Sequence, residues 1–291
     1  MPLRLAYFIA NLASRIGFFC DRKHRNRTIK NILHAGITDN YEEAKNIALD
    51  NFINLGKVAV EFVKLDQVFT PENINKYVTY NISEEIKQAL ADPRGTVCAS
   101  AHYGNWEISG LSLSLLFREI VSIGRTMDNP KLSEYIFSKR KSFKQEIYPQ
   151  DGALKRLLIG LKQQKLLGIL IDQHPGDNNG AATTFFSLPV RTHNAPALLS
   201  LKTGAPLLLI VTRRLDDNFH FELLMRGPFV IVPSGDIVKD AQLLTQKIND
   251  EFEKIVRENP SQWLWAARRW RDIYPKKSKT NRLAKPAPIH I

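Results

Sequence analysis

Apolar residues recur at helical spacing over the first quarter of the chain. Residues 3–20 are mostly apolar, and arginines at positions 4 and 15 interrupt the run. In residues 41–65 the apolar side chains fall near one face of a helix: Ile47, Phe52, Leu55, Ala59, Phe62 and Val63. The first quarter is therefore predicted to be helical.

Further along, short apolar runs of strand length alternate with helical patterns. Strands are predicted at residues 96–101, 166–171, 207–212 and 219–224. Helices are predicted at residues 105–117, 153–164, 196–203 and 236–258. Continuous apolar strands indicate burial on both faces. The alternation predicts an α/β domain with a mixed, largely parallel sheet flanked by helices.

These patterns divide the chain into three parts. Residues 1–40 form a predicted helical segment that associates with a membrane, and residues 41–275 form the α/β domain. Residues 276–291 mix Lys, Ser, Asn and Pro and are predicted to be a flexible basic tail.

The N-terminal run is short for a transmembrane helix, which needs about 20 predominantly apolar residues. Its two arginines make a full span costly, and no clear cleavage site of a signal peptide follows. A basic cluster comes next, at residues 22–30. This order suits a helix lying in the headgroup region of an anionic membrane. The alternative is a helix packed on the domain with a solvated basic end.

Composition and charge narrow the class of protein. The chain is 44% hydrophobic and 24% charged, which is typical of a globular protein and not of a disordered one. Its 41 Lys and Arg exceed its 29 Asp and Glu, so the net charge of +12 favours an anionic partner. Nucleic acid, acidic phospholipid and an acidic carrier protein all qualify. Cys20 and Cys98 form neither a metal-site spacing nor a disulfide framework, and both are expected to be buried.

A candidate reactive group stands directly after the first predicted strand. His102 follows the run at residues 96–101, and functional groups gather at the carboxyl ends of strands in open α/β sheets. Glu107 lies in the first turn of the next predicted helix, where a carboxylate is favoured. From there Glu107 could accept a hydrogen bond from one imidazole nitrogen, which leaves the other nitrogen to act as a general base. Such a pair is also common by chance in purely structural or solvated positions.

Other catalytic motifs are missing from the sequence. It contains neither a Gly-x-Ser-x-Gly nucleophile elbow nor a His-Glu-x-x-His zinc motif. A serine nucleophile or a metal mechanism therefore has little support.

The segment Ala-His-Tyr-Gly-Asn-Trp-Glu at residues 101–107 resembles the His-x-x-x-x-Asp/Glu block of the glycerolipid and lysophospholipid acyltransferase superfamily. More narrowly, it is similar to the His-Phe-Gly-Asn-Trp-Glu block of the bacterial lipid A biosynthesis acyltransferases. Five further blocks resemble this family in the same order, at residues 125–132, 172–176, 185–189 (with Ser187 where glycine is usual), 196–206 and 259–270. The resemblance covers roughly residues 1–272.

The resemblance implies transfer of an acyl chain from an acyl carrier protein thioester, or from CoA, to a hydroxyl of a lipid A precursor. It implies His102 as general base and Glu107 as its orienting partner, with no metal or cofactor, since the donor is already activated. The implied location is the cytoplasmic face of the bacterial inner membrane, with a peripheral or a single N-terminal anchor.

Weaker site candidates come from the other blocks. Arg125 is a candidate for holding an acceptor phosphate or the developing oxyanion, unless it forms a surface ion pair. The remaining substrate-binding candidates are Asn105, Asn129, Asp172 and Gln173. For Asp172 the alternative is a structural role, bracing the loop at a strand end.

Two groups of basic and aromatic residues remain open to interpretation. The lysines and arginine of residues 139–144 are either a solvated face or a contact for the acidic carrier or the lipid phosphates. The Trp- and Arg-rich residues 263–274 are either an interfacial patch or a packed terminal helix with exposed arginines.

The sequence leaves three alternative functions open. The first is an acyltransferase of the same superfamily that acts on another glycophospholipid, mannolipid or aminolipid. The second is a nucleic-acid-binding protein, although the sequence has none of the usual signatures. The third is a non-enzymatic protein at the membrane surface, which would not need His102 and Glu107.

Overall fold

The computed structural model describes residues 1–124, 129–149, 152–176 and 179–271. Its centre is a seven-stranded sheet in which only the β8–β9 pair is antiparallel. From one edge to the other its strands are β1 (Val78–Thr79), β9 (Phe221–Arg226), β8 (Leu207–Arg214), β2 (Thr96–Ser100), β5 (Leu166–Leu170), β3 (Ile120–Ile123) and β4 (Gln145–Tyr148). The predicted mixed, largely parallel sheet is confirmed.

A separate antiparallel hairpin joins β6 (Ala181–Phe185) to β7 (Leu188–Thr192). Its turn residues Phe186 and Ser187 have φ values of 54° and 58°. Ser187 therefore adopts a left-handed conformation that glycine favours, which agrees with the glycine expected there by resemblance.

Helices cover both faces of the sheet. The helices are α1 (Leu3–Cys20), α2 (Arg22–His34), α3 (Tyr41–Val68), α4 (Ile74–Tyr77), α5 (Glu84–Leu90), α6 (Trp106–Leu116), α7 (Pro130–Ser142), α8 (Ala153–Lys162), α9 (Ala195–Thr203) and α10 (Ile237–Glu258), with a short 3-10 turn, η1, at Pro260–Gln262. Several begin at side-chain caps, as where Asn40 accepts from the backbone amides of Glu42 and Glu43 at the start of α3.

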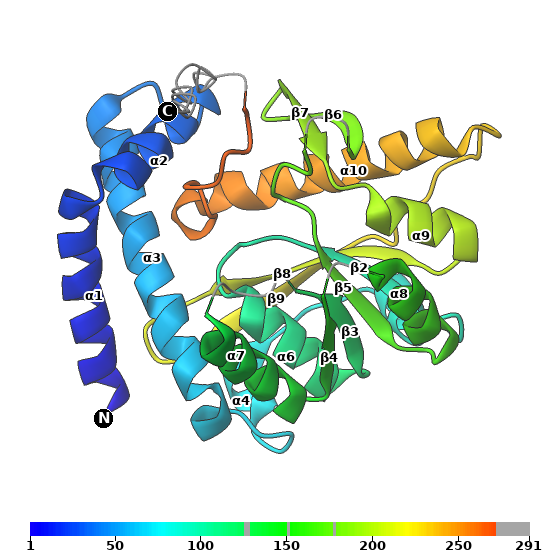
Figure 1. Ribbon diagram of the computed structural model, residues 1–291, viewed down its shortest axis with the longest axis horizontal. Helices are drawn as coiled ribbons and strands as arrows, with labels where there is room; N and C mark the ends of the chain where they lie inside the picture. Colours follow the sequence, from blue (N-terminus) through cyan, green and yellow to red (C-terminus); the bar gives the residue numbers. More distant parts are fainter. Residues whose placement is uncertain (125–128, 150–151, 177–178, 272–291) are drawn as a thin grey trace, which may run out of the picture.

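Two hydrophobic clusters lie on opposite faces of the sheet. One joins Val97, Leu167 and Leu209 to the apolar faces of α8, α9 and α10. The other joins the alternate strand residues, such as Cys98 and Leu208, to α5, α6 and the end of α3. Figure 1 shows these layers, with α9 and α10 on one side of the sheet and α4 and α6 on the other. Burial on both faces accounts for the continuous apolar strands.

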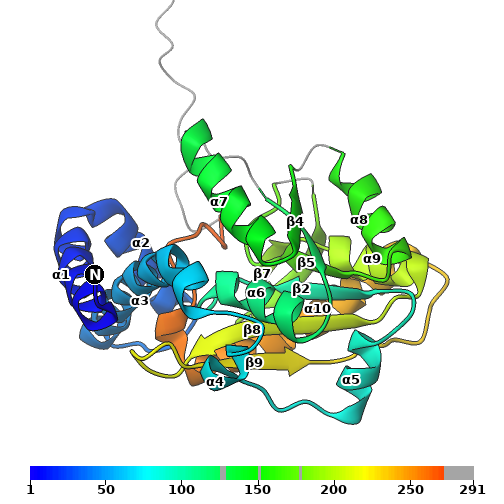
Figure 2. The same cartoon turned by 90° about the horizontal axis from the view of Figure 1, so that it is seen from below.

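Helix α1 lies outermost and packs beside α3 (Figures 1 and 2). Tyr7 and Phe18 are buried on its inner face. Its outer face is a stripe of large exposed apolar side chains: Leu5, Phe8, Ile9, Leu12, Ile16 and Phe19. By length and composition α1 is the one helix in the described part of the chain that could cross a membrane. Cys98 is buried as expected, but Cys20 at the end of α1 is exposed, so that half of the cysteine prediction is wrong.

Candidate active site

His102 and Asp172 face each other because of the register of two neighbouring strands. Strand β2 pairs in parallel with β5, and Ser100 lies opposite Leu170. His102 and Asp172 each stand two residues past that pair, at the same edge of the sheet, where adjacent strands are about 4.8 Å apart. His102 Nδ1 lies 2.8 Å from Asp172 Oδ1, and the backbone amide of His102 donates to Asp172 Oδ2 at 3.0 Å.

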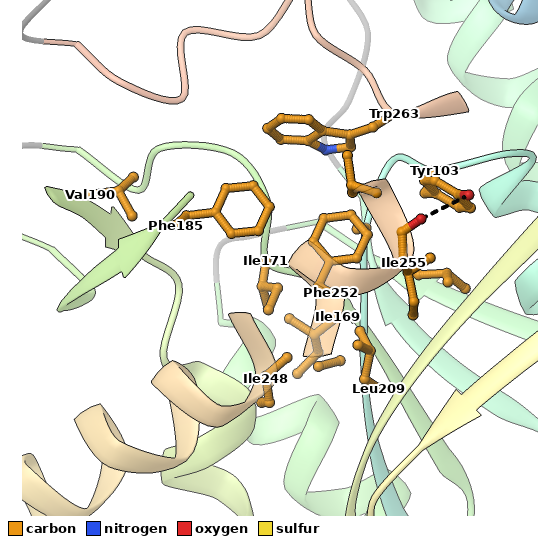
Figure 3. Packing of buried hydrophobic residues seen from close by; sticks show 14 of the residues in the cluster. Tyr103, Ile169, Ile171, Phe185, Val190, Leu209, Ile248, Phe252, Ile255 and Trp263 are labelled. Carbon is orange, nitrogen blue, oxygen red and sulfur yellow. Dashed lines mark hydrogen bonds between the residues drawn. The ribbon is translucent and has the colours of Figure 1, made fainter. Parts of the chain in front are cut away.

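Asp172 also accepts a hydrogen bond from the indole of a buried tryptophan. Trp263 Nε1 donates to Asp172 Oδ2 at 2.9 Å. Figure 3 shows Trp263 packed among the buried rings of Phe185 and Phe252. The carboxylate is 2% exposed, so its hydrogen bonds are made away from bulk water.

The electrostatics of this pair favour opposite charges. Burial works to lower the pKa of His102, but the charge and hydrogen bond of Asp172 outweigh it and raise this pKa above its ordinary value. Burial works to raise the pKa of Asp172, but the His102 ring and the hydrogen bonds from His102 and Trp263 hold it below its ordinary value. Asp172 is therefore a carboxylate near neutral pH, and it can stabilise an imidazolium.

Glu107 has a different partner from the one predicted. Arg140 of α7 binds it in a bidentate pair, with Nε 2.7 Å from Oε2 and Nη2 2.6 Å from Oε1. Trp106 Nε1 donates to the same carboxylate at 3.0 Å. Glu107 thus bonds to Arg140 and Trp106, whereas the imidazole of His102 makes its hydrogen bond to Asp172. The prediction that Glu107 makes this contact is corrected accordingly.

Asn105 is committed to the protein rather than to a substrate. It is fully buried, and its Oδ1 caps α6 by accepting from the backbone amides of Glu107 and Ile108. Its Nδ2 donates to Glu61 of α3 at 2.7 Å. Asn105 is thus bonded within the protein, where the sequence suggested a substrate contact, and its partner Glu61 was not among the predicted residues.

A cavity of about 220 Å³ opens beside His102. It lies between α6, α7 and the face of the sheet formed by β2, β3, β5 and β8, and both His102 and Glu107 line it. Much of its wall is apolar and comes from Leu113, Ile120, Ile123, Ile136, Phe137 and Ile210. The ring of Trp106 lies 5.0 Å from that of His102, edge to face, at the same end.

The remaining candidates are dispersed. Gln173 is exposed next to Asp172. Asn129 is exposed and caps α7 by accepting from the backbone amides of Lys131 and Leu132. Arg125 lies outside the described residues, as does the predicted tail at 276–291.

The basic run at residues 139–144 is a solvated face only in part, because Lys141 and Lys144 are exposed whereas Lys139 and Arg140 are not. Lys139 is 8% exposed and donates to the Val63 carbonyl and to Asp66, both at 2.6 Å. Its neighbour Arg140 is the partner of Glu107. Two adjacent cations of this run, Lys139 and Arg140, therefore pair with residues of the protein, which the sequence of the run does not indicate.

The aromatic C-terminal segment is packed. Trp263, Trp265 and Trp270 are all buried. Arg269 is buried as well and donates to the Arg191 carbonyl and to Thr192. The packed interpretation is therefore confirmed for these residues, except that the segment is not helical after η1 and Arg269 is not exposed.

Comparison with known proteins finds similarity to acyltransferases. Residues 1–272 match the model of the bacterial lipid A biosynthesis acyltransferases. The chain is 25% identical over 191 residues to the phosphatidylinositol mannoside acyltransferase of Mycobacterium tuberculosis, which covers 64% of this chain and 58% of that protein. It is 22% identical over 231 residues to the lipid A biosynthesis palmitoleoyltransferase of Escherichia coli, covering 79% of this chain and 73% of that protein. The lauroyltransferase of the same bacterium gives 22% identity over 233 residues, with the same coverage.

Proposed function

Because the chain belongs to the bacterial lipid A biosynthesis acyltransferase family, we propose that it transfers a fatty acyl chain from a thioester to a hydroxyl of a lipid A precursor. Acyl carrier protein is the proposed donor, and acyl-CoA is the alternative. The observation that carries the proposal is the His102–Asp172 pair, whose histidine lines a largely apolar cavity.

In the proposed mechanism Asp172 accepts a hydrogen bond from Nδ1–H of His102 and so leaves Nε2 as the basic nitrogen. Nε2 makes no hydrogen bond within the described residues. It takes the proton of the acceptor hydroxyl while the oxygen attacks the thioester carbonyl. When the C–S bond breaks, the thiolate recovers that proton from the imidazolium, which Asp172 has stabilised. Atoms and charge balance without a protein nucleophile.

The cavity suits the acyl chain of the donor. Its apolar walls would exclude water from the chain and hold the carbonyl near His102, and such positioning supplies much of the acceleration in transfer reactions. The Glu107–Arg140 pair lines the same cavity. We propose that this pair keeps α6 and α7 together around the chain, and that Arg125 contacts an acceptor phosphate.

We also propose that α1 seats the protein on the cytoplasmic face of the inner membrane. Its exposed apolar stripe would enter the lipid, and the net charge of +12 would favour anionic headgroups. An acidic carrier protein would be attracted by the same charge.

A second candidate acceptor is a mannosylated phosphatidylinositol. The mycobacterial relatives, whose matches span less than two thirds of their own length, support it. Both acceptors present a sugar hydroxyl and a phosphate, so the chemistry at His102 would be the same.

The test uses the full chain in vesicles of anionic phospholipid. Acyl carrier protein charged with chains of several lengths is added with either a lipid A precursor or a mannosylated phosphatidylinositol, and the lipids are analysed by mass spectrometry. The proposal expects the mass of one added acyl group on the lipid A precursor, and no product from His102→Gln. A product on the mannolipid alone would replace the first acceptor by the second, and no product on either would overturn the proposal.

A further inference from the structure

Glu61 is a buried carboxylate that binds three separate elements. It lies on α3 with no exposed surface and accepts four hydrogen bonds. Tyr7 OH of α1 is 2.7 Å from Oε1. Arg214, at the end of β8, places Nε 2.6 Å from Oε1 and Nη2 2.6 Å from Oε2. Asn105 Nδ2 is 2.7 Å from Oε2.

The last of these bonds reaches the segment that carries His102. A second path leads to the same segment, because Arg214 Nη1 donates to Asn54 Oδ1 and Asn54 Nδ2 lies 3.5 Å from the Gly104 carbonyl. Residues 104 and 105 are thus both tied to one buried ion pair. His102 lies two residues before them, on the same loop.

Capping of α6 does not by itself require the bond between Asn105 and Glu61. The cap uses Oδ1 of Asn105, and Asp or Ser can serve at an N-cap about as well as Asn. The bond from Nδ2 is an additional charge-assisted contact in a dry environment, where an unpaired carboxylate would be costly. This bond connects the loop after β2 to α3.

We propose that Glu61 is a positioning residue that fixes His102 against Asp172 by holding Asn105, while Tyr7 and Arg214 hold Glu61. Through Tyr7 the lipid-facing helix α1 becomes part of the active-site support. The inference rests on the proposed acyl transfer for its kinetic readout, but not for its structural one.

The principal test is Asn105→Asp, which keeps the size of the side chain and its capping oxygen. It replaces the donor to Glu61 by a second carboxylate. At alkaline pH the two carboxylates repel, so kcat should fall by roughly 10- to 100-fold, as expected for a small displacement of a catalytic group. The KM of the donor should stay within about twofold, because the acyl cavity is unchanged.

The pH dependence distinguishes positioning from simple capping. Two carboxylates in contact share a proton as the pH falls, and the protonated oxygen can then donate as the Asn105 amide did. The ratio of variant to wild-type kcat should therefore rise as the pH is lowered. Equal kcat for the variant and the wild type at every pH would overturn the proposal, because a cap alone tolerates aspartate.

Tyr7→Phe tests the connection to α1. It removes one hydroxyl and leaves the packed ring, so kcat should fall by about threefold to tenfold, the typical worth of one hydrogen bond. Tyr41→Phe, at an exposed position of α3, is the matched control and should not change kcat. An unchanged kcat in Tyr7→Phe would remove α1 from the proposed support.

Hydrogen exchange supplies a readout that does not depend on acyl transfer. Backbone amides of residues 102–108 should exchange faster in Asn105→Asp than in the wild type at alkaline pH, and the difference should shrink at lower pH. If the wild type transfers no acyl group but this pattern is seen, the proposed function fails and the positioning role stands. If exchange is unchanged, the positioning role fails whatever the activity.

Discussion

Two carboxylates lie beside His102, and they differ in origin and environment. Asp172 comes from the neighbouring parallel strand and is almost completely buried against Trp263. Glu107 comes from the helix that follows His102, lines the cavity and is neutralised by Arg140. A carboxylate five residues after a histidine in a motif is therefore not automatically its hydrogen-bond partner. The register between β2 and β5, and not the spacing along the chain, brings His102 into contact with Asp172.

The largest effect is expected for Asp172→Asn. The substitution keeps the shape of the side chain but removes the charge that stabilises the imidazolium and fixes the Nδ1–H tautomer. We expect kcat to fall on the order of 10³-fold or more, as in comparable His–Asp pairs. Steady-state transfer kinetics check this value. A loss below about tenfold would mean that Asp172 does not orient the base.

Glu107→Gln should have a smaller effect of a different kind. The change weakens the bidentate pair with Arg140 and should lower the free energy of unfolding by about 2 kcal/mol, with a roughly tenfold loss of kcat. The coupling free energy of the pair is measured by denaturant unfolding of three variants: Glu107→Gln, Arg140→Gln and the double variant. Strictly additive losses would show that the two side chains are not coupled. Glu42→Gln, in an exposed pair with Lys45, is the matched control and should matter much less.

Trp263→Phe tests the support behind Asp172. Phenylalanine preserves an aromatic ring but removes the Nε1 donor, so Asp172 loses one of its hydrogen bonds. We expect kcat to fall about threefold to tenfold, the typical worth of one hydrogen bond. The control is Trp265→Phe, which removes a donor to the Pro260 carbonyl instead. Equal losses in the two variants would assign the effect to packing.

The pH profile should show the smallest but most specific difference. The base must be neutral, and Asp172 raises the pKa of His102, so kcat/KM of the wild type should still be rising at pH values above the ordinary histidine pKa of about 6.5. Without the Asp172 charge, burial dominates and lowers the His102 pKa, so the midpoint in Asp172→Asn should move to lower pH. The midpoint in Glu107→Gln should move less. A larger shift of the midpoint in Glu107→Gln than in Asp172→Asn would mean that Glu107, and not Asp172, mainly sets the pKa of His102.

The elements next to the site could be predicted because their signals are local. The apolar run before His102 became β2, and the polar residues after it include the Asn105 cap of α6. The same holds for β5 before Asp172. The sequence therefore predicted where β2 and β5 end, and it showed that a polar side chain follows each of them.

The pairing of His102 with Asp172 could not be predicted in the same way. It requires β2 and β5 to be neighbours, and two strands, β3 and β4, lie between them in the sequence but not in space. Neither was predicted, because each has only four residues. The Arg140 partner of Glu107 lies on α7, which follows the first of these strands. The burial of Lys139 likewise depends on the position of α3.

The most direct test of the central claim is the tautomer of His102, read from long-range ¹⁵N–¹H correlations of its ring at a pH above its pKa. We expect a proton on Nδ1, donated to Asp172, and an unprotonated Nε2. This tautomer should be unchanged in Glu107→Gln and altered in Asp172→Asn. A proton on Nε2 in the wild type, or a tautomer that responds to Glu107 and not to Asp172, would contradict it.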